Sequence, residues 1–510
     1  MKKFIRLVAS RYFLAVVCIV LEFVQLLAVF LYLYGYFFPI TILGWALQFV
    51  VLLYIINRND IPEFKLPWFL LLLLLPVTGA FIFLLFATNE VSKKERERHA
   101  QAMDALQPHG ERTGSEELLR ERSEAAFRQA AYLHTAAEAP CYSGTKIDYY
   151  PLGEALYPAL CRALEQAEHF IFMEYFIIQE GQVWNSLHEI LKKKAAEGVG
   201  VYVMYDDFGC MMAGLPDKYD KLLRTEGIHA IPSNKLRPVF TRRHNNRDHR
   251  KITVVDGLVG FTGGINLSDR YMNLEEVFGH WKDTAIRLEG PAVRSLTAMF
   301  LSAWNTQSPE PLDVRPFMEI QPPAKEDGCF AVPFGDGPEP LYHDYIGENV
   351  FLNMIYSATK YVYITTPYLI CDHALLNALR TAAKRGVDVR VITPHIPDKK
   401  TVFLMTRSNY LPLVSDGVKI YEYTPGFIHA KNYIADDEIA VCGSINLDYR
   451  SLVHNYECGV WFYKSSCIAA MREDFLRTVG VSEEITPAAA GQHGLKRFLS
   501  EVLKILSTLM

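Results

Sequence analysis

The chain has 510 residues, of which 50% are hydrophobic and 21% are charged, and its formal net charge is -5. This length is enough for two or three domains, and the acidic balance argues against bulk nucleic-acid binding. The nine cysteines are scattered, with no Cys-x-x-Cys pair, which indicates reduced thiols rather than a disulfide framework or a zinc site.

Three apolar runs occupy the N-terminal part of the chain, at residues 12–36, 40–56 and 67–87. A helix needs about 20 apolar residues to cross a bilayer, so residues 1–91 are predicted to be a membrane anchor with two or three transmembrane helices. Glu22 interrupts the first run, which could instead lie at the interface, because a carboxylate is costly inside a bilayer.

A multi-pass location in the cell membrane follows from these runs, with the catalytic part on the cytoplasmic side. The reduced cysteines and the dense basic cluster after the third run favour that side. Residues 92–138 are highly charged and rich in Ala, Glu and Arg, which predicts a charged helical linker.

The remainder of the chain repeats one plan of a strand, an amphipathic helix and a second strand. The segments are 169–176, 187–197 and 199–205 in the first half, and 361–368, 375–385 and 387–392 in the second. This order predicts α/β units built on a mostly parallel sheet.

A Pro- and Gly-rich stretch at 309–338 joins the halves, so domains are predicted over 139–310 and 311–510. Residues 495–509 have the pattern of an amphipathic helix. This helix is predicted either to pack on the catalytic body or to lie in a membrane interface.

One pattern of polar residues occurs once in each half, with every spacing preserved. The first copy contains His249, Lys251, Asp256 and Asn266, and the second contains His429, Lys431, Asp436 and Asn446. Each copy also has Gly-Gly or Gly-Ser just before its Asn. Chance rarely repeats so long a pattern, so the doubled motif marks a functional site.

The motif chemistry suits a phosphate group. Each copy reads as a strand, on which His and Lys two residues apart project to the same side. Lys offers charge and three donors, and His can attack phosphorus or carry a proton near neutral pH. Two such pairs could supply a nucleophile and a general acid. Asp256 and Asp436 are at odd offsets and are expected to support the strands.

The paired H-x-K-x4-D-x6-G-[GS]-x-N motifs resemble those of the phospholipase D superfamily, over roughly residues 140–510. A narrower resemblance, to bacterial cardiolipin synthases, rests on residues 281–284 and 444–457. The resemblance implies two tandem phospholipase D-like α/β/α sandwich domains. They would form a pseudo-twofold catalytic body preceded by transmembrane helices.

The resemblance also implies a reaction, the transfer of a phosphatidyl group from one phosphatidylglycerol to another. His249 would be the nucleophile, forming a phosphohistidine, and His429 the general acid and base. The phosphate would be held by Lys251, Lys431, Asn266 and Asn446. Glu457 would orient a catalytic histidine, and Asp283 would do the same in the first half. No metal or cofactor is expected, because the lysines supply the positive charge.

A basic insertion before His249 bears on the lipid partner. It contains Lys235, Arg237, Arg242, Arg243 and Arg247. It could gather anionic lipid headgroups or be a solvated loop. Two other functions stay open: a hydrolase of the same superfamily, acting on lipid or DNA, and a non-catalytic lipid-binding protein. The second substrate, the acyl-chain preference and the oligomeric state also stay open.

Overall fold

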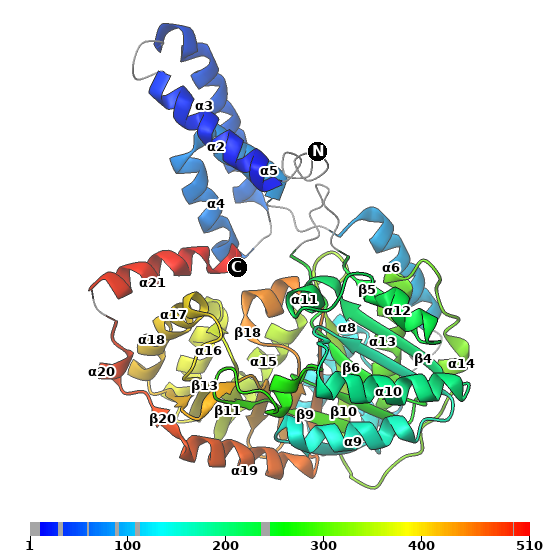
Figure 1. Cartoon of the computed structure of the whole chain (residues 1–510). Helices are drawn as coiled ribbons and strands as arrows, with labels where there is room; N and C mark the ends of the chain where they lie inside the picture. The colour runs from blue at the N-terminus through cyan, green and yellow to red at the C-terminus, as the bar shows by residue number, and fades with distance from the viewer. Residues whose placement is uncertain are drawn as a thin grey trace. The chain divides into compact units, whose positions relative to one another are not determined.

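A computed structural model describes residues 11–28, 34–58, 61–86, 91–107, 113–235, 245–492 and 494–509 (Figure 1). The chain forms two compact units. Unit 1 comprises Met1–Glu90, Leu236–Asn245 and Phe498–Met510, and unit 2 comprises Val91–Lys235 and Asn246–Arg497.

The helices of unit 1 do not match the predicted membrane anchor. They are α2 (Arg11–Ala28), α3 (Tyr34–Asn57), α4 (Pro62–Leu74) and α5 (Pro76–Phe86). Pro76 divides the third apolar run, because proline has no N–H and clashes with the preceding turn, and α4 and α5 have only 13 and 11 residues.

Within the described part of the chain, no helix combines the length and apolar character that a membrane crossing requires. The predicted transmembrane helices are therefore wrong. The expected multi-pass location, with its cytoplasmic catalytic part, is contradicted by the same finding. The carboxylate of Glu22 is buried instead against α5, where it accepts hydrogen bonds from the Thr78 backbone N–H at 3.1 Å and from the Thr78 hydroxyl.

The charged segment after unit 1 is helical. It forms α6 (Lys93–Leu106), α7 (Ser115–Arg122) and α8 (Glu124–Ala137). Ser92 and Ser123 cap α6 and α8, because their hydroxyls accept backbone N–H groups of the first turn. The helix α8 buries Ala130 and Leu133 in the core of the second half, so it packs on the body.

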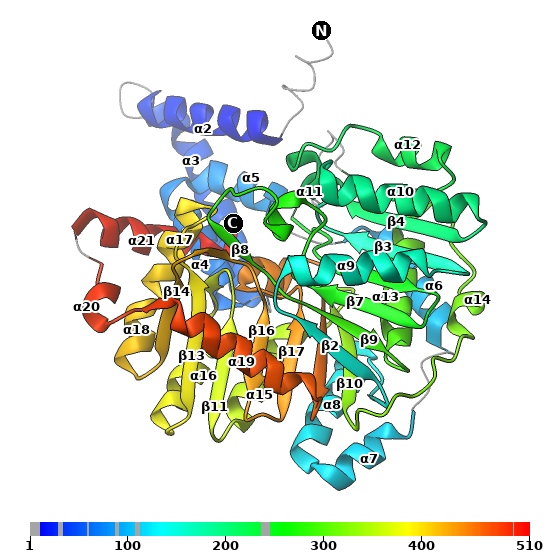
Figure 2. The same cartoon turned by 60° about the horizontal axis from the view of Figure 1, so that its bottom comes forward.

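Each half of unit 2 contains one large sheet (Figure 2). The first sheet has the order β2 (Lys146–Tyr150), β9 (Ala285–Glu289), β7 (Val259–Gly263), β6 (Lys251–Val255), β3 (Phe170–Tyr175), β4 (Gly200–Asp206), β5 (His229–Ser233). The second has the order β1 (Tyr142–Ser143), β10 (Phe330–Asp336), β19 (Glu457–Tyr463), β17 (Ile439–Gly443), β16 (Asn432–Ala435), β11 (Tyr361–Thr365), β13 (Asp388–Pro394), β14 (Lys419–Tyr423), β20 (Ser482–Glu484).

Two short pairs complete the strands. They are β12 (Leu369–Ile370) with β18 (Leu447–Asp448), and β8 (His280–Lys282) with β15 (Gly426–Ile428). The second pair is parallel and joins a strand of the first half to a strand of the second. The halves are therefore linked by backbone hydrogen bonds as well as by side chains.

Both large sheets are mixed, so the prediction of a mostly parallel sheet is wrong. The strands β3, β4 and β5 run parallel, whereas β6 pairs antiparallel with both β3 and β7. The cause is a hairpin inside each motif. Asp256 and Gly257 have φ of 53° and 67°, the left-handed conformation that favours a tight turn, and the Leu258 N–H donates to the Val255 carbonyl at 3.0 Å to close it. Asp436 and Asp437, at 56° and 58°, form the second turn.

The helices of unit 2 lie on both faces of these sheets. In the first half they are α9 (Gly153–Glu165), α10 (Gln182–Ala196), α11 (Asp207–Met212), α12 (Tyr219–Thr225), α13 (Val293–Gln307), α14 (Arg315–Met318) and the short η4 (Asp269–Met272). In the second they are α15 (Ile346–Ser357), α16 (His373–Lys384), α17 (Lys400–Ser408), α18 (Tyr410–Ser415), α19 (Cys467–Gly480), α20 (Pro487–Ala490) and η5 (Arg450–His454). The chain ends with α21 (Gly494–Leu506) and η6 (Ser507–Leu509).

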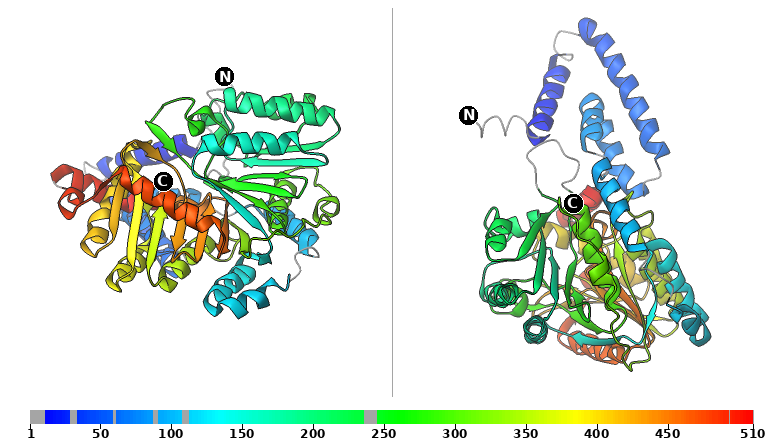
Figure 3. Two further views of the ribbon diagram at one scale, coloured as in Figure 1. Left: turned by 90° about the horizontal axis from the view of Figure 1, so that it is seen from below. Right: turned by 90° about the vertical axis from the view of Figure 1, so that its right-hand side faces the viewer.

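A shared core joins the two halves. In the first half, α9 and α10 cover the outer face of the sheet (Figure 2 and the left view of Figure 3). On the inner side, Phe172 stacks on Phe300 of α13 at 4.2 Å, and Tyr363 stacks on Phe475 of α19 at 4.7 Å, within one hydrophobic cluster. The α/β prediction is thus confirmed. The division into domains at residue 310 stays a prediction.

Candidate active site

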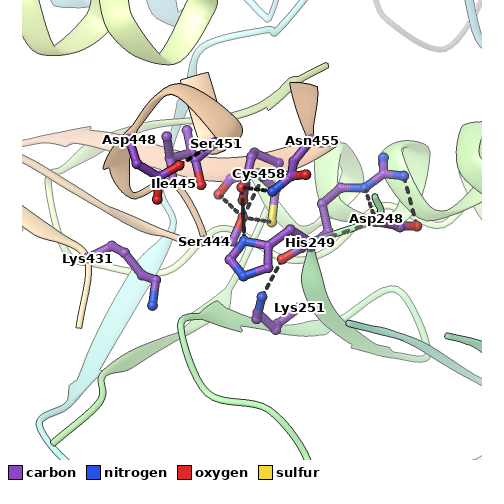
Figure 4. A network of polar contacts seen from close by, with 12 residues as sticks. Asp248, His249, Lys251, Lys431, Ser444, Ile445, Asp448, Ser451, Asn455 and Cys458 are labelled. Atoms are coloured by element: carbon purple, nitrogen blue, oxygen red, sulfur yellow. Dashed lines mark hydrogen bonds and ion pairs between the residues drawn. The ribbon is translucent and has the colours of Figure 1, made fainter. Parts of the chain in front are cut away.

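The two motif histidines lie just before the equivalent strands β6 and β16. His249 and His429 come two residues before Lys251 and Lys431, and all four side chains are buried. The Lys251 ammonium donates to the carbonyl of His249, and that of Lys431 to the carbonyl of His429. Figure 4 shows Lys251 and Lys431 beside the His249 ring, and the charges of both lysines act on that ring. The structure thus brings both motifs together.

Each histidine is oriented by a carboxylate from the other half. Nδ1 of His249 lies 2.9 Å from both carboxylate oxygens of Glu457. Nδ1 of His429 lies 2.6 Å from Oδ2 of Asp283. With the proton on Nδ1 donated to the carboxylate, Nε2 keeps its lone pair free for a substrate. The exchange of partners between halves is not visible in the sequence.

Backbone hydrogen bonds also join each histidine to the other half. The N–H of His249 donates to the carbonyl of Tyr456 at 2.9 Å, and the N–H of His429 donates to that of Lys282 at 2.7 Å. Tyr456 and Lys282 directly precede the two orienting carboxylates. Each histidine is therefore held at its main chain and its ring by consecutive residues of the opposite half.

The first motif has Gly-Gly and the second has Gly-Ser, and the second residue of each pair lies beside one of the two carboxylates. The hydroxyl of Ser444 donates to Glu457, and it accepts the N–H of Cys458 at 3.0 Å. At the equivalent Gly264 a side chain has no room, because a Cβ there would lie 2.9 Å from Cγ of Asp283. Ser444 is a functional neighbour that sequence reasoning missed, although the Gly-Ser variant signals it.

Burial favours the neutral form of both imidazoles. It lowers the pKa of His249 to about 4, although the Glu457 carboxylate acts to raise that pKa. The pKa of His429 is also held well below its ordinary value, first by burial and then by the charges of Lys431 and Lys251. Both rings are therefore uncharged near neutral pH.

The lysines and carboxylates are also shifted. Burial lowers the pKa of Lys251 to about 8 and that of Lys431 to about 7. Burial raises the pKa of Asp283 to about 7, against the opposing charge of Lys431. For Glu457 burial has the same direction, but the interaction with His249, the charge of Lys251 and the hydrogen bond of Ser444 outweigh it and hold the pKa below its ordinary value. An entering phosphate anion would stabilise the charged forms of both lysines.

The motif aspartates lie away from this cluster, at the hairpin turns. The Asp256 carboxylate accepts backbone N–H groups of Glu168, His169 and Phe170 at 2.7–2.8 Å. Asp436 does the same for Thr359, Lys360 and Tyr361. Both hold the start of the neighbouring central strand, β3 or β11.

The motif asparagines are buried beneath the site. Oδ1 of Asn266 accepts the Ile177 N–H at 3.0 Å, and Nδ2 donates to the Tyr271 hydroxyl at 2.7 Å. The side chain of Asn446 hydrogen-bonds Asp448, while its Oδ1 has no hydrogen-bond partner among the described residues. Their expected contact with phosphate stays a prediction.

Aromatic rings that the sequence analysis did not single out line the site. Phe176 meets the His249 ring at 5.0 Å, and Tyr271 and Trp281 meet the His429 ring at 5.6 and 5.5 Å. Trp281 belongs to residues 281–284, which carry part of the family resemblance, so the sequence contained a signal for this ring. These rings limit the access of water to the imidazoles.

The predicted basic loop is only partly described. Residues 237, 242 and 243 lie outside the described part of the chain. Arg247 is a structural cation, because its guanidinium is buried 3.5 Å from the Asp206 carboxylate and donates to the Asn234 carbonyl at 3.1 Å. The gathering of headgroups by this loop stays a prediction.

Comparisons with known proteins point in one direction. The family model described as "Cardiolipin synthase, PLD-like domain" matches residues 351–479. The chain is 34% identical to the cardiolipin synthase of Alkalihalophilus pseudofirmus, covering 85% of this chain and 86% of that protein. It is 32% identical to that of Geobacillus sp. (strain WCH70), covering 96% and 99%.

Two further similarities add to this. An uncharacterized protein of Streptococcus mutans serotype c is 39% identical, covering 90% of this chain and 99% of its own. The crystal structure of phosphatidylserine synthase from Haemophilus influenzae Rd KW20 has a TM-score of 0.56 at 14% identity, covering 76% of this chain and 98% of that one. That likeness supports the fold.

Proposed function

The chain belongs to the cardiolipin synthases of the phospholipase D superfamily, and we propose how its two motifs divide the work of that reaction. The enzyme is a phosphatidyltransferase that joins two phosphatidylglycerol molecules and releases glycerol. His249 is the nucleophile and His429 the general acid and base. The observation that carries this proposal is the pair of buried histidines, each held at Nδ1 by a carboxylate of the other half.

In the first step, Nε2 of His249 attacks the phosphorus of the donor. The bond from phosphorus to the glycerol oxygen breaks, and that oxygen takes a proton from Nε2 of His429. His429 must therefore be protonated when the donor is bound. An anionic phosphodiester favours protonation of His429, because it adds a negative charge beside an imidazole whose pKa is otherwise held low.

In the second step, a hydroxyl of another phosphatidylglycerol replaces glycerol. His429 takes the hydroxyl proton, the oxygen attacks phosphorus, and the bond from phosphorus to His249 breaks. Lys251 and Lys431 would stabilise the charge on the phosphoryl oxygens in both steps. Asn266 and Asn446 are proposed to help bind that phosphate, from the loops that follow β7 and β17.

The lipid partners follow from this reaction. Phosphatidylglycerol is both donor and acceptor, and the enzyme meets it in an anionic lipid surface. The identity of the acceptor is less constrained than that of the donor, since water or another alcohol could attack the same phosphohistidine. Product identity therefore tests the proposal.

The test is product analysis with vesicles of phosphatidylglycerol as the sole lipid. The intact enzyme is expected to release cardiolipin and glycerol in equal amounts. His249→Ala should abolish both products and the labelling of protein by phosphate-labelled lipid, while His429→Ala should still form labelled protein slowly. His169→Ala, which removes an exposed imidazole outside the site, is the matched control.

Two results would contradict the proposal. Phosphatidic acid as the main product would mean that water is the acceptor. If His249→Ala formed labelled protein and His429→Ala did not, His429 would be the nucleophile and His249 the general acid and base.

A further inference from the structure

The two halves carry a second pair of equivalent residues that the motif does not include. Arg270 and Arg450 each lie four residues after the motif asparagine, Asn266 or Asn446. They lie on η4 and at the start of η5, the short helical segments that follow the two motifs. Equivalent positions invite a comparison of what each guanidinium contacts.

Arg270 lies against aromatic faces rather than a carboxylate. Its guanidinium carbon is 5.4 Å from the centre of the Tyr271 ring and 5.5 Å from that of the Trp281 ring. Its Nε is buried without a hydrogen-bond partner, and none of the ion pairs among the described residues includes it. The adjacent Asp269 carboxylate is already used, because it accepts the N–H groups of Gln182 and Val183 at the start of α10.

The same two aromatic rings flank the general acid and base. Tyr271 and Trp281 meet the His429 ring at 5.6 and 5.5 Å, so Arg270 and His429 contact the same two rings. Burial and the charges of the lysines lower the pKa of His429, and the charge of Arg270 adds to that effect. An unpaired cation thus lies on the His429 side of the site.

Arg450 has a different environment. The carboxylates of Asp448 and Asp206 act on its charge, and so does the cation of Arg247. Asp206 also accepts the N–H of Asp248, next to the nucleophile, at 3.0 Å. Burial lowers the pKa of Arg450 against the opposing charges of Asp448 and Asp206, so Arg450 is a buried cation on the His249 side, where the phosphatidyl donor is attached.

We propose that Arg270 binds the phosphodiester of the acceptor phospholipid. The product contains two phosphodiesters joined through one glycerol, and the motif histidines and lysines account for only the reacting one. The acceptor hydroxyl must lie at His429, which removes its proton. The acceptor's own phosphodiester, one glycerol away, then needs a cation on the same side. This inference rests on the proposed function, including the roles of the two histidines.

A neutral acceptor separates this role from the chemistry. With isotope-labelled glycerol, the phosphatidyl group on His249 passes to a glycerol oxygen, the phosphorus–nitrogen bond breaks, and the hydroxyl proton goes to His429. This exchange regenerates phosphatidylglycerol and uses the same histidines. Its acceptor lacks the second phosphodiester and the diacylglycerol attached to it, so Arg270→Lys and Arg450→Ala are needed to assign a change in the ratio to the charge of Arg270.

The experiment compares cardiolipin formation with glycerol exchange for Arg270→Ala and Arg450→Ala in the full chain, on phosphatidylglycerol vesicles. Each variant is assayed at its own optimum pH, since the loss of Arg270 removes a charge near His429. For Arg270→Ala the ratio of cardiolipin formed to glycerol exchanged should fall at least about tenfold, the cost of a lost charge-assisted contact. Arg270→Lys should recover part of the loss, and Arg450→Ala should keep the ratio of the intact enzyme.

An unchanged ratio in Arg270→Ala would overturn the proposal, and so would a fall in the ratio that is confined to Arg450→Ala. The exchange itself reports folding of each variant and tests the proposed function separately. If the intact enzyme did not exchange glycerol at all, the phosphohistidine reaction would fail, not only the role of Arg270.

Discussion

Glu457 lies 208 residues after His249 in the chain, yet both of its carboxylate oxygens are 2.9 Å from Nδ1 of that histidine. Asp283 has the mirrored relationship with His429, across 146 residues. Neither half can orient its own histidine. The site therefore exists only when both halves are folded and in contact.

Neutralising Glu457 tests this relationship directly. In Glu457→Gln the amide retains the shape but loses the charge that stabilises the positively charged His249 ring while phosphorus is bonded to its Nε2. We expect kcat for cardiolipin formation to fall about a hundredfold or more, within the range of acid–base contributions. Steady-state kinetics on phosphatidylglycerol vesicles measures this.

Ser444→Ala is the matched control for that change, because it removes a hydrogen bond to Glu457 and leaves the carboxylate. A single such bond is worth about 1 kcal/mol, so the loss should be about fivefold. If Glu457→Gln were no more harmful than Ser444→Ala, the charge of Glu457 would have no role in the reaction.

The absence of a side chain at Gly264 is a second requirement of the site. Gly264→Ser copies the residue of the second motif, but its Cβ would overlap the Asp283 carboxylate. We expect Asp283 to move away from His429, with overpacking costing about 1–3 kcal/mol in the free energy of unfolding and activity falling strongly. Urea denaturation and activity assays measure the two effects.

The reciprocal Ser444→Gly creates space rather than overlap and should be milder in both measurements. Equal activity in Gly264→Ser and the intact enzyme would show that the carboxylate can shift without consequence.

The pH dependence of kcat/KM should follow the lysines. In the free enzyme the pKa values of Lys431 and Lys251 are lowered to about 7 and about 8. Rising pH therefore removes their protons and with them their positive charge. Binding of an anionic headgroup should weaken, and kcat/KM should fall above about pH 7. Its acidic limb should lie near pH 4, where His249 gains a proton.

The bound complex should behave differently, because the phosphodiester stabilises the charged lysines. The alkaline fall of kcat should therefore lie at higher pH than that of kcat/KM. A kcat/KM profile that stays level to pH 10 would contradict the lowered lysine pKa values.

Asp256 should matter for stability more than for chemistry. Asp256→Ala removes the acceptor of three backbone N–H groups at a residue with φ of 53°. We expect the free energy of unfolding to fall by at least about 2 kcal/mol. Activity per folded molecule should fall far less than in His249→Ala.

Asp256→Asn is the matched comparison, since Asn tolerates the left-handed conformation and retains one acceptor oxygen. It should lose less stability than Asp256→Ala. A full loss of activity in a stably folded Asp256→Ala would place this aspartate in the chemistry after all.

Local patterns in the sequence were reliable where the physics is local. The spacing of two predicted that His249 and Lys251 project together, and both are buried in the site, whereas Asp256 lies in the hairpin turn after β6 rather than on the strand. The antiparallel pairing was missed, although Asp256-Gly257 is a typical hairpin turn. The transmembrane prediction used apolar runs alone, and Pro76 breaks one of those runs.

The sequence by itself determined that two His–Lys pairs exist and that they repeat in equivalent strands, because spacing along a strand decides the direction of a side chain. Only the tertiary structure decided which carboxylate serves which histidine. Asp283 and Glu457 could each have served the nearer motif, and the choice was made when the two sheets packed on a shared core. That packing brings together partners 146 and 208 residues apart in the chain. No local sequence pattern encodes such a contact.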